Sequence, residues 1–254
     1  MNNLNIKRKL NRIITENFAK FFSTEVIYLS LSNEDYGENI KDEILVGGID
    51  EAGRGPVIGP MVMAAVKFPA RILAKVLTKE FPDIKESKEL SPHERYKIAD
   101  FLWKLRIIRA YLAIIPPAVI DFWVMNKSLN DLEANVAITL LKKFLYECFV
   151  VYIDSPSTSE SFLNYISKYK DWNGPPHVIA EVKADKLRIP VAMASIFAKI
   201  MRDSIIKEVK IKIGMDVGSG YPSDPKTRKA LPYLMKRYQW IIRKSWKTVQ
   251  RNNS

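Results

Sequence analysis

Four acidic side chains in this sequence follow apolar runs of the length that strands have. Asp50 and Glu51 close one run, Asp154 closes a second and Asp185 follows a third. Because strand ends gather at one edge of an α/β sheet, acids that are distant in sequence can converge there. Any one of them alone could also be a helix cap or a turn residue, since Asp is common after strands. Together they indicate a site built from carboxylates.

Such a site would bind a hard divalent cation. Clustered carboxylates repel one another and favour protonation unless cations neutralise them. The chain has two histidines, His93 and His177, and a single cysteine, Cys148, which are too few for zinc or for histidine-based nucleophilic catalysis. Oxygen ligands suit Mg²⁺ or Mn²⁺. We expect His93 to be a solvated helix residue and Cys148 a buried thiol, and we assign His177 no role.

A glycine-rich turn follows the first two acids. Adjacent side chains of a regular strand point to opposite faces, so Asp50 and Glu51 cannot both reach one ion from it. We expect Gly53 and Gly55 to let the chain kink where Glu51 leaves the sheet, which would bring both carboxylates to one site. The Gly-Arg-Gly turn around Arg54 would also let backbone atoms approach a ligand closely.

The elements that would position these residues alternate between strands and helices, which predicts an α/β sheet. The unbroken apolar run 149–154 predicts a strand that is buried on both faces. The other strands are expected in the runs 45–50, 61–68, 106–115 and 177–182. Helices are expected over residues 131–146, 160–169, 191–213 and 224–246.

Local signals refine two of these boundaries. Ser91 and Glu94, with a proline after the serine, form a capping box that starts a further helix. Pro116 and Pro117 should break the strand that precedes them.

The charge of the chain points to a polyanionic partner. It carries 40 Lys and Arg against 28 Asp and Glu, a formal net charge of +12, which favours nucleic acid. No apolar run approaches the ~18 residues of a membrane span, and no signal-like apolar segment follows the N-terminal charges. We therefore expect a cytoplasmic protein that binds no membrane. We also expect a monomer, although the sequence does not show the oligomeric state.

Several segments of the sequence resemble type 2 ribonucleases H, the ribonuclease HII family, and they occur in the family's order. Together they span residues 45–248 and leave the first 44 outside the resemblance. The closing segment 243–248 looks like the archaeal branch. The other segments are 48–56, 86–91, 152–156, 183–203 and 218–225.

This resemblance implies a ribonuclease H-like fold, a mixed sheet flanked by helices, with a small C-terminal helical region. It implies that Asp50, Glu51, Asp154 and Asp185 are the catalytic acids and hold two ions of Mg²⁺ or Mn²⁺. The implied activity is that of an endoribonuclease that hydrolyses the RNA strand of RNA/DNA hybrids. It would also cut 5′ of ribonucleotides embedded in duplex DNA, leaving 5′-phosphate and 3′-hydroxyl ends.

The resemblance also assigns substrate contacts. The backbone of Gly53, Arg54 and Gly55 and the hydroxyl of Tyr221 would contact the 2′-hydroxyl, which separates RNA from DNA. The Tyr221 ring would pack on the next sugar, although a core tyrosine is the alternative from the residues alone. Candidate phosphate contacts, each of which could instead be merely solvated, are Lys88, Lys199 and Arg202.

The sequence departs from the family pattern at a few positions. Glu86 and Glu89 stand where the family has Asp and Lys, which removes a positive charge beside Lys88. Pro190 lies one position later than the family's proline, and this shift affects the expected orientation of Asp185.

With the resemblance, the chain divides into three expected regions. Residues 4–22 have apolar side chains at helical spacing, followed by a strand at 25–31 and a polar linker at 32–43. The sequence leaves open whether this extension is a genuine appendage, an interaction arm or the product of a translation start placed too early. The expected regions are an N-terminal extension (1–44), a ribonuclease H-like catalytic domain (45–215) and a C-terminal substrate-contacting helical region (216–254).

Two other functions remain open at this point. A hybrid-binding module whose acids have lost catalytic competence would keep the charge and the fold. A Holliday-junction resolvase of the same fold would need neither Tyr221 nor the Gly-Arg-Gly turn. Contact with a replication clamp is also left open.

Overall fold

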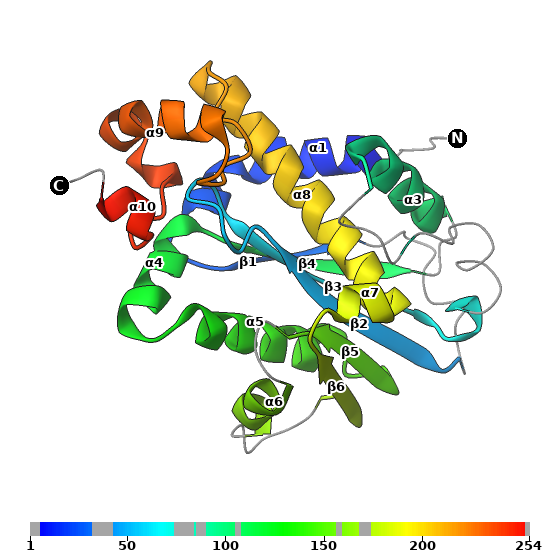
Figure 1. The fold of residues 1–254 in the computed structure, drawn as a ribbon. Coiled ribbons are helices and arrows are strands. Elements are labelled where there is room, and N and C mark those ends of the chain that lie inside the picture. Colours follow the sequence, from blue (N-terminus) through cyan, green and yellow to red (C-terminus); the bar gives the residue numbers. More distant parts are fainter. Residues whose placement is uncertain are drawn as a thin grey trace.

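A mixed sheet stands at the centre of the computed structural model, which describes residues 6–31, 43–73, 84, 90–104, 108–155, 159–167 and 174–251. In the described chain the sheet has six strands, in the order β1-β4-β3-β2-β5-β6 (Figure 1). The first four in that order are antiparallel neighbours, and β5 and β6 continue the sheet parallel to β2. Their bounds are Ile27–Leu31 (β1), Leu45–Ala52 (β2), Met61–Pro69 (β3), Arg109–Ile115 (β4), Val150–Asp154 (β5) and His177–Glu181 (β6).

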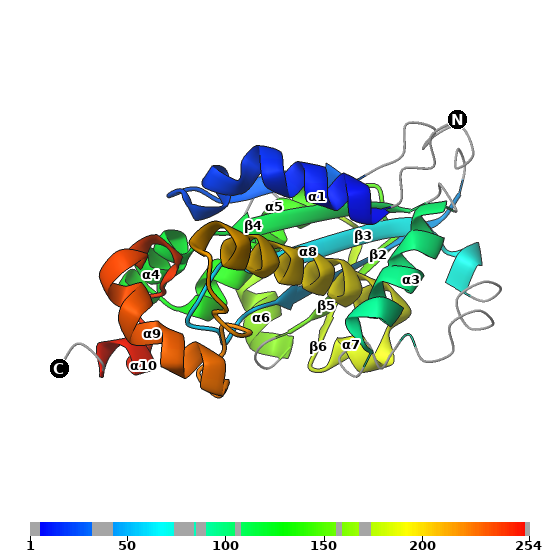
Figure 2. The same cartoon turned by 90° about the horizontal axis from the view of Figure 1, so that it is seen from above.

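Helices cover both faces of the sheet (Figures 1 and 2). The long helix α8 (Ile189–Ile213) lies across β2 and β3 on one face, with α1 (Ile6–Asn17) and α3 (Pro92–Lys104) packed against it. Helix α5 (Leu129–Phe144) covers the opposite face and contacts α4 (Pro117–Asn126) and α6 (Ser159–Ser167). Each face thereby has its own apolar core.

Gly48 fixes how closely α8 approaches the sheet. A Cβ atom at Gly48 would lie 2.2 Å from the carbonyl carbon of Pro190 and 2.6 Å from the amide nitrogen of Val191. No side chain fits into that space, so the first turn of α8 rests directly on β2, two residues before Asp50. The helix start is therefore held beside the acidic end of the strand.

The N-terminal segment belongs to the same body. Strand β1 pairs with β4 at the edge of the sheet. Ile6, Leu10 and Phe21, from α1 and the 3₁₀ turn η1 (Phe18–Phe22), are buried in the core that α8 shares with the sheet. The Phe22 ring meets the Trp240 ring edge-on at 4.6 Å between centroids, so the segment also contacts the C-terminal region.

The C-terminal region is not the single helix that we predicted over 224–246. Helix α9 (Pro225–Arg237) begins at an Asp224 cap, and a 3₁₀ turn η4 (Gln239–Ile241) and a short helix α10 (Lys247–Gln250) follow it. The helix stops because the chain pairs with a distant loop. Ile242 forms a β-bridge with Ile58, and the amide of Gly59 donates to the carbonyl of Ile241 at 2.8 Å.

Most of the other predicted elements are confirmed. The β2–β3 pair is present, and the Ser91 box is formed, with the Ser91 amide donating to the Glu94 carboxylate at 2.7 Å. Cys148 is buried and His93 is exposed, as expected. Pro117 begins helix α4 because proline suits the first helical position, an outcome that we did not predict.

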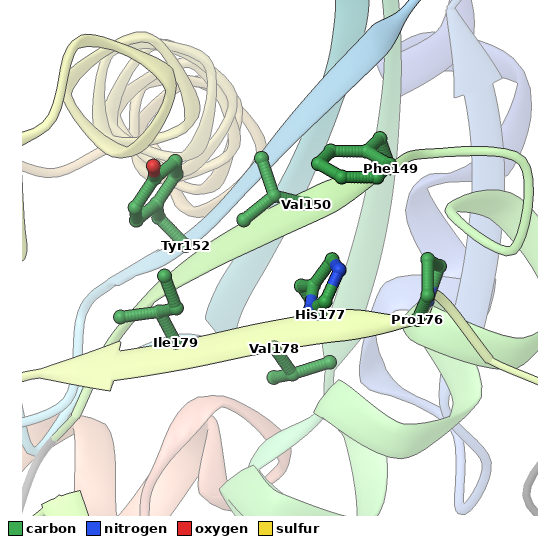
Figure 3. A pocket seen from close by; sticks show the side chains of 7 residues that line it. All are labelled: Phe149, Val150, Tyr152, Pro176, His177, Val178 and Ile179. Carbon is green, nitrogen blue, oxygen red and sulfur yellow. The ribbon is translucent and has the colours of Figure 1, made fainter.

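The prediction for β5 was wrong in one respect. One face of this strand, with Val151 and Ile153, is buried, whereas the residues of the other face are half-buried, although α7 and α8 contact the strand. Phe149 is 56% exposed, and the shallow pocket beside it also includes Tyr152, His177 and Ile179 (Figure 3). In the described residues no helix has the length and apolar character needed to cross a membrane.

Candidate active site

Asp50 and Asp154 lie side by side at the ends of neighbouring strands. β2 and β5 are parallel with Ile49 opposite Ile153, so the next residue on each strand is the acid. Parallel neighbours in register point to the same face, about 4.8 Å apart between strands. That face is the one that α8 covers, and it leaves Asp50 only 2% exposed. The predicted convergence of these two acids is therefore present.

Asp185 belongs to a short helix that follows β6 rather than to a strand end. Lys183 adopts a left-handed conformation, with φ of 60°, which turns the chain sharply from β6 into the single-turn helix α7 (Ala184–Leu187). The amide of Ala184 donates to a carboxylate oxygen of Asp154 at 2.7 Å. This bond joins the first residue of α7 to Asp154, and Asp185, the next residue, is buried.

Glu51 does not leave the sheet where we predicted. It remains in the ladder opposite Met63, and the pairing continues through Ala52 because β3 extends to Met61. The kink comes at Gly53, which has a φ of 84°. By strand alternation the Glu51 side chain starts from the face opposite to that of Asp50.

Asp50 sits in an environment that favours its protonated form. Burial raises the pKa of Asp50 well above its ordinary value, and the nearby charges of Glu51 and Asp154 raise it further. The Ser195 hydroxyl and the backbone amide of Glu51 act in the opposite direction. Oδ1 accepts that amide at 2.7 Å, whereas Oδ2 is buried and accepts no hydrogen bond from the described residues. A bound cation would fit this oxygen and the surplus negative charge.

The positions of the acidic side chains do not by themselves form a complete metal site. Among the described residues, no three Asp, Glu, His or Cys side chains lie in a metal-binding arrangement. By strand pairing the Glu51 side chain starts from the opposite face, although its charge still acts on Asp50. A cation would have to draw the side chains together.

Side chains of the C-terminal segment donate hydrogen bonds to the backbone of the Gly-Arg-Gly turn. The guanidinium of Arg243 donates to the carbonyls of Gly53 at 2.7 Å and of Arg54 at 3.0 Å, and the Trp246 indole donates to the carbonyl of Gly55 at 3.0 Å. Each of the three carbonyls of the turn thus accepts a hydrogen bond from the C-terminal segment. Sequence reasoning missed Arg243 as a site residue, although its segment was noted for its archaeal likeness.

Arg243 is an unusual group to bury. It is fully enclosed, and burial, together with the nearby Arg202, lowers the pKa of Arg243 to about 9. Its Nε also donates to the carbonyl of Gly59 at 3.0 Å. Because these carbonyls satisfy its donors, the arginine can stay in the core and fix the loop.

Tyr221 is brought to the same turn. Its ring lies against Gly55, where an added Cβ would be 3.6 Å from a ring carbon, and the side chain is 39% exposed. The carbonyl of Gly220 accepts the Val57 amide at 2.8 Å, which ties the two loops together. Tyr221 is therefore a partly exposed loop residue and not a core tyrosine.

The candidate phosphate contacts have different environments. Arg202 is only 4% exposed; its guanidinium donates to the carbonyl of Ser219 at 2.9 Å and lies 5.3 Å from the centre of the Tyr221 ring. It supports the Tyr221 loop from within. Lys199 is half-buried, one turn of α8 after Ser195 and on the same side. Lys88, with Glu86 and Glu89, lies outside the described residues.

Arg54 has partners that the sequence analysis did not identify. Its guanidinium donates to Glu133 at 2.8 Å and to Asn130, both on α5. Burial raises the pKa of Glu133 to about 7, and the charge of Arg54 opposes that shift while the charge of Asp50 adds to it. A glutamate on the apolar face of a helix, beside Leu132 and Val136, was the available signal.

Comparisons with known proteins show which family this sequence resembles. The ribonuclease HII family model matches residues 47–249. Ribonuclease HII of Methanococcus vannielii is 36% identical over 235 residues, which cover 86% of this chain and 93% of the relative. Ribonuclease HII of Thermococcus sibiricus is 38% identical over 209 residues, which cover 81% and 90%.

Solved structures show the same fold. Ribonuclease H2 from Pyrococcus horikoshii OT3 is similar with a TM-score of 0.69 at 34% identity, covering 82% of this chain and 97% of that chain. The PCNA:RNase HII complex from Archaeoglobus fulgidus gives a TM-score of 0.67 at 31% identity, with coverage of 82% and 97%. Bst-RNase HIII in complex with Mn²⁺ gives 0.69 at 18% identity, covering 83% and 70%, and supports the fold alone. The chain belongs to the ribonuclease HII family, the endoribonucleases that cleave the RNA of RNA/DNA hybrids.

Proposed function

We propose that this enzyme, besides cleaving hybrids, cuts 5′ of single ribonucleotides embedded in duplex DNA and leaves 5′-phosphate and 3′-hydroxyl ends. The observation that carries this proposal is the placement of the Tyr221 ring on Gly55. A turn with its carbonyls fixed from one side and a half-exposed phenol beside it form a small recognition element next to the strand-end acids. Such an element suits a single sugar hydroxyl better than a long stretch of RNA.

The 2′-hydroxyl is the group that this element would recognise. It is the feature that tells RNA from DNA at a given position, and it can both donate and accept a hydrogen bond. The backbone of Gly53, Arg54 and Gly55 and the Tyr221 hydroxyl would contact it, with the ring packed on the next sugar. Arg243 and Arg202 hold these groups in place, because one fixes the turn and the other the Tyr221 loop.

The metal-binding residues in this proposal are Asp50, Glu51, Asp154 and Asp185. The buried oxygen of Asp50 and the raised pKa of its carboxyl group fit a cation at this position. Enzymes of this family depend on metal ions, and we propose two ions of Mg²⁺ or Mn²⁺ with substrate bound. Bound there, they would supply the charge that activates the attacking water and stabilises the departing 3′ oxygen.

The remaining basic residues position the strand. Lys199 is proposed as a phosphate contact because it lies on the same side of α8 as Ser195, next to Asp50. Arg202, being buried, would act through the Tyr221 loop. Lys88 stays a predicted phosphate contact.

Two wider expectations belong to this proposal. The Archaeoglobus fulgidus relative has been solved in complex with PCNA, and contact of this chain with a replication clamp stays a prediction that co-purification with its own clamp would test. We also propose that the enzyme acts in the cytoplasm as a monomer.

The decisive experiment uses a duplex with one ribonucleotide and maps the cut by its product lengths. Cleavage on the 5′ side in Mg²⁺ or Mn²⁺, with none in chelator, is the expected result. The same duplex with a 2′-deoxy analogue should remain intact, and equal cutting of both would favour a resolvase. Asp50→Asn should bind substrate without cutting it, and intact cleavage by this variant would contradict the metal assignment. An uncut wild-type reaction on this duplex would contradict the proposed cleavage at single ribonucleotides.

A further inference from the structure

A fifth carboxylate stands in line with the strand-end acids. Strand β6 runs parallel to β5 with Glu181 opposite Asp154. Since Asp154 in turn lies beside Asp50, the three residues form a row across β2, β5 and β6 on one face of the sheet. The row, as we define it, is Asp50, Asp154 and Glu181.

Glu181 differs from the other two in having its own cation. The guanidinium of Arg188 donates to both of its carboxylate oxygens, each at 2.7 Å. The same guanidinium lies 5.0 Å from the centre of the Tyr152 ring. Because side chains alternate along a strand, Tyr152 lies on the same face of β5 as Asp154. The two paired side chains are 41% and 28% exposed, so the pair stands at the rim of the site.

The backbone holds Arg188 at this place. Its amide donates to the carbonyl of Ala184 at 2.7 Å, which closes α7, and its carbonyl accepts the amides of Val191 and Ala192 at 3.0 Å, which opens α8. Arg188 is thus the junction of the two helices, in the segment where Pro190 is displaced by one position. The side chain is directed across the end of β6.

We propose that Arg188 is a positioning residue that withholds Glu181 from the metal ions and so sets the charge of the row. The inference rests on the proposed function, which places divalent ions at these strand ends. A paired Glu181 adds almost no net charge, because the guanidinium binds both of its oxygens. An unpaired Glu181 would add one negative charge one strand away from Asp154.

Electrostatics gives the two partners opposite effects. Removing the charge of Arg188 leaves Glu181 as an additional carboxylate, which attracts a dication. Removing the charge of Glu181 leaves Arg188 as an unpaired cation, which repels it. At about 8–10 Å and partial solvent exposure, one unit of charge changes dication affinity about three- to tenfold. If the pair only braced α7, breaking it from either side would weaken metal binding.

The test is calorimetric titration of Mn²⁺ into the full chain without nucleic acid. Arg188→Gln should lower the Kd for Mn²⁺ about three- to tenfold, and Glu181→Gln should raise it by a similar factor. The double variant should return to within about twofold of the wild type. Arg188→Lys, which keeps the charge but loses the paired geometry, should also stay within about twofold.

A matched control uses an ion pair remote from the row. Arg71→Gln breaks the pair with Glu43, which precedes Asp50 by seven residues of extended chain, and should leave the Kd unchanged. Single variants that shift the Kd in the same direction would overturn the inference while leaving the proposed function in place. A wild-type chain that binds no Mn²⁺ without nucleic acid would overturn the inference, whereas the proposed function would fall only if cleavage of the single-ribonucleotide duplex did not depend on the metal. Near-ultraviolet circular dichroism of each variant checks that the fold is retained.

Discussion

Burial decides the behaviour of the carboxylates that lie around the Gly-Arg-Gly turn. Asp50 and Glu133 come from different elements, a strand and a helix, and the pKa of each is raised mainly because water is excluded. Arg54 offsets the shift of Glu133 only in part. The fold alone therefore favours the protonated forms of these carboxyl groups, and a bound cation would favour their charged forms.

The buried Glu133 gives a pH-dependent stability. Its pKa is about 7 in the folded state and near 4.5 when unfolded, so its contribution is fully present below about pH 4.5 and is lost as the pH rises through 7. Glu133→Gln should remove up to about 3 kcal/mol of that loss, so the variant should gain stability relative to the wild type at pH 8. Urea unfolding of both proteins at pH 4.5 and pH 8 measures the difference in their free energies of unfolding. An equal difference between the two proteins at both pH values would contradict the assignment.

Tyr221 allows the hydroxyl and the ring to be tested separately. Tyr221→Phe keeps the ring on Gly55 but loses the hydroxyl, so kcat/KM for a single embedded ribonucleotide should fall about tenfold to a hundredfold. Tyr221→Ala should lose more, because the sugar contact goes as well. Since the side chain is 39% exposed, both variants should melt within a few degrees of the wild type. Unchanged cleavage by Tyr221→Phe would remove the hydroxyl from sugar recognition.

At the scale of elements, the N-terminal segment acts as a brace between the sheet and the C-terminal region. α1 packs on α8, β1 completes the edge beside β4, and η1 places Phe22 against Trp240. Trp240 directly precedes Ile241, whose carbonyl binds Gly59 next to the recognition turn. These contacts indicate that the N-terminal segment is a genuine part of the folded enzyme, rather than an interaction arm or the product of a misplaced translation start.

Removing this brace should therefore affect folding. A chain that starts at residue 32 would expose the core around Ile6 and Phe21, and we expect it to aggregate or to lack a cooperative transition. Phe22→Ala should lower the free energy of unfolding by about 1–3 kcal/mol, and each kcal/mol should lower the melting temperature by about 3 °C. Lys20→Ala, which changes an exposed side chain, should leave the free energy of unfolding almost unchanged. A fully active and equally stable truncated enzyme would show that the segment is dispensable.

Local sequence signals predicted the elements, and long-range contacts explain what they missed. The β2–β3 pair and the capping box at Ser91 depend on neighbouring residues, and both are present. The end of α9 depends on pairing with a distant segment, because Ile242 bridges to Ile58. The course of Glu51 depends on how far the β2–β3 pairing extends, and the presence of the two strands does not reveal that length. A helical or strand period cannot reveal such partners.

The same limit applies to the site. The acids and Tyr221 were predicted because their types and their resemblance to the family marked them. Arg243 was not, because its role lies in donating to carbonyls about 190 positions earlier in the chain. A buried arginine that binds backbone oxygens has no local pattern, so only the folded chain identifies it.

At the scale of the whole molecule, net charge should govern how the enzyme meets its substrate. The chain carries +12, and α9 and its flanks add basic residues near the Tyr221 loop. Neutralising phosphates releases counterions, so affinity falls with salt by about one power of ten per tenfold salt for each contact. Even a few phosphate contacts should raise the KM for a hybrid by about tenfold or more between 50 and 200 mM salt.

The turnover number should respond differently from the KM. Asp50 and Asp185 are buried, so the chemical step is shielded from ions in solution, and kcat should change less than about twofold over the same range. Steady-state cleavage of one hybrid at several KCl concentrations separates the two quantities, with glutamate replacing chloride as a control for anion binding. A KM that is independent of salt would mean that the basic surface does not contact the phosphates, and recognition would then depend on the turn and Tyr221 alone.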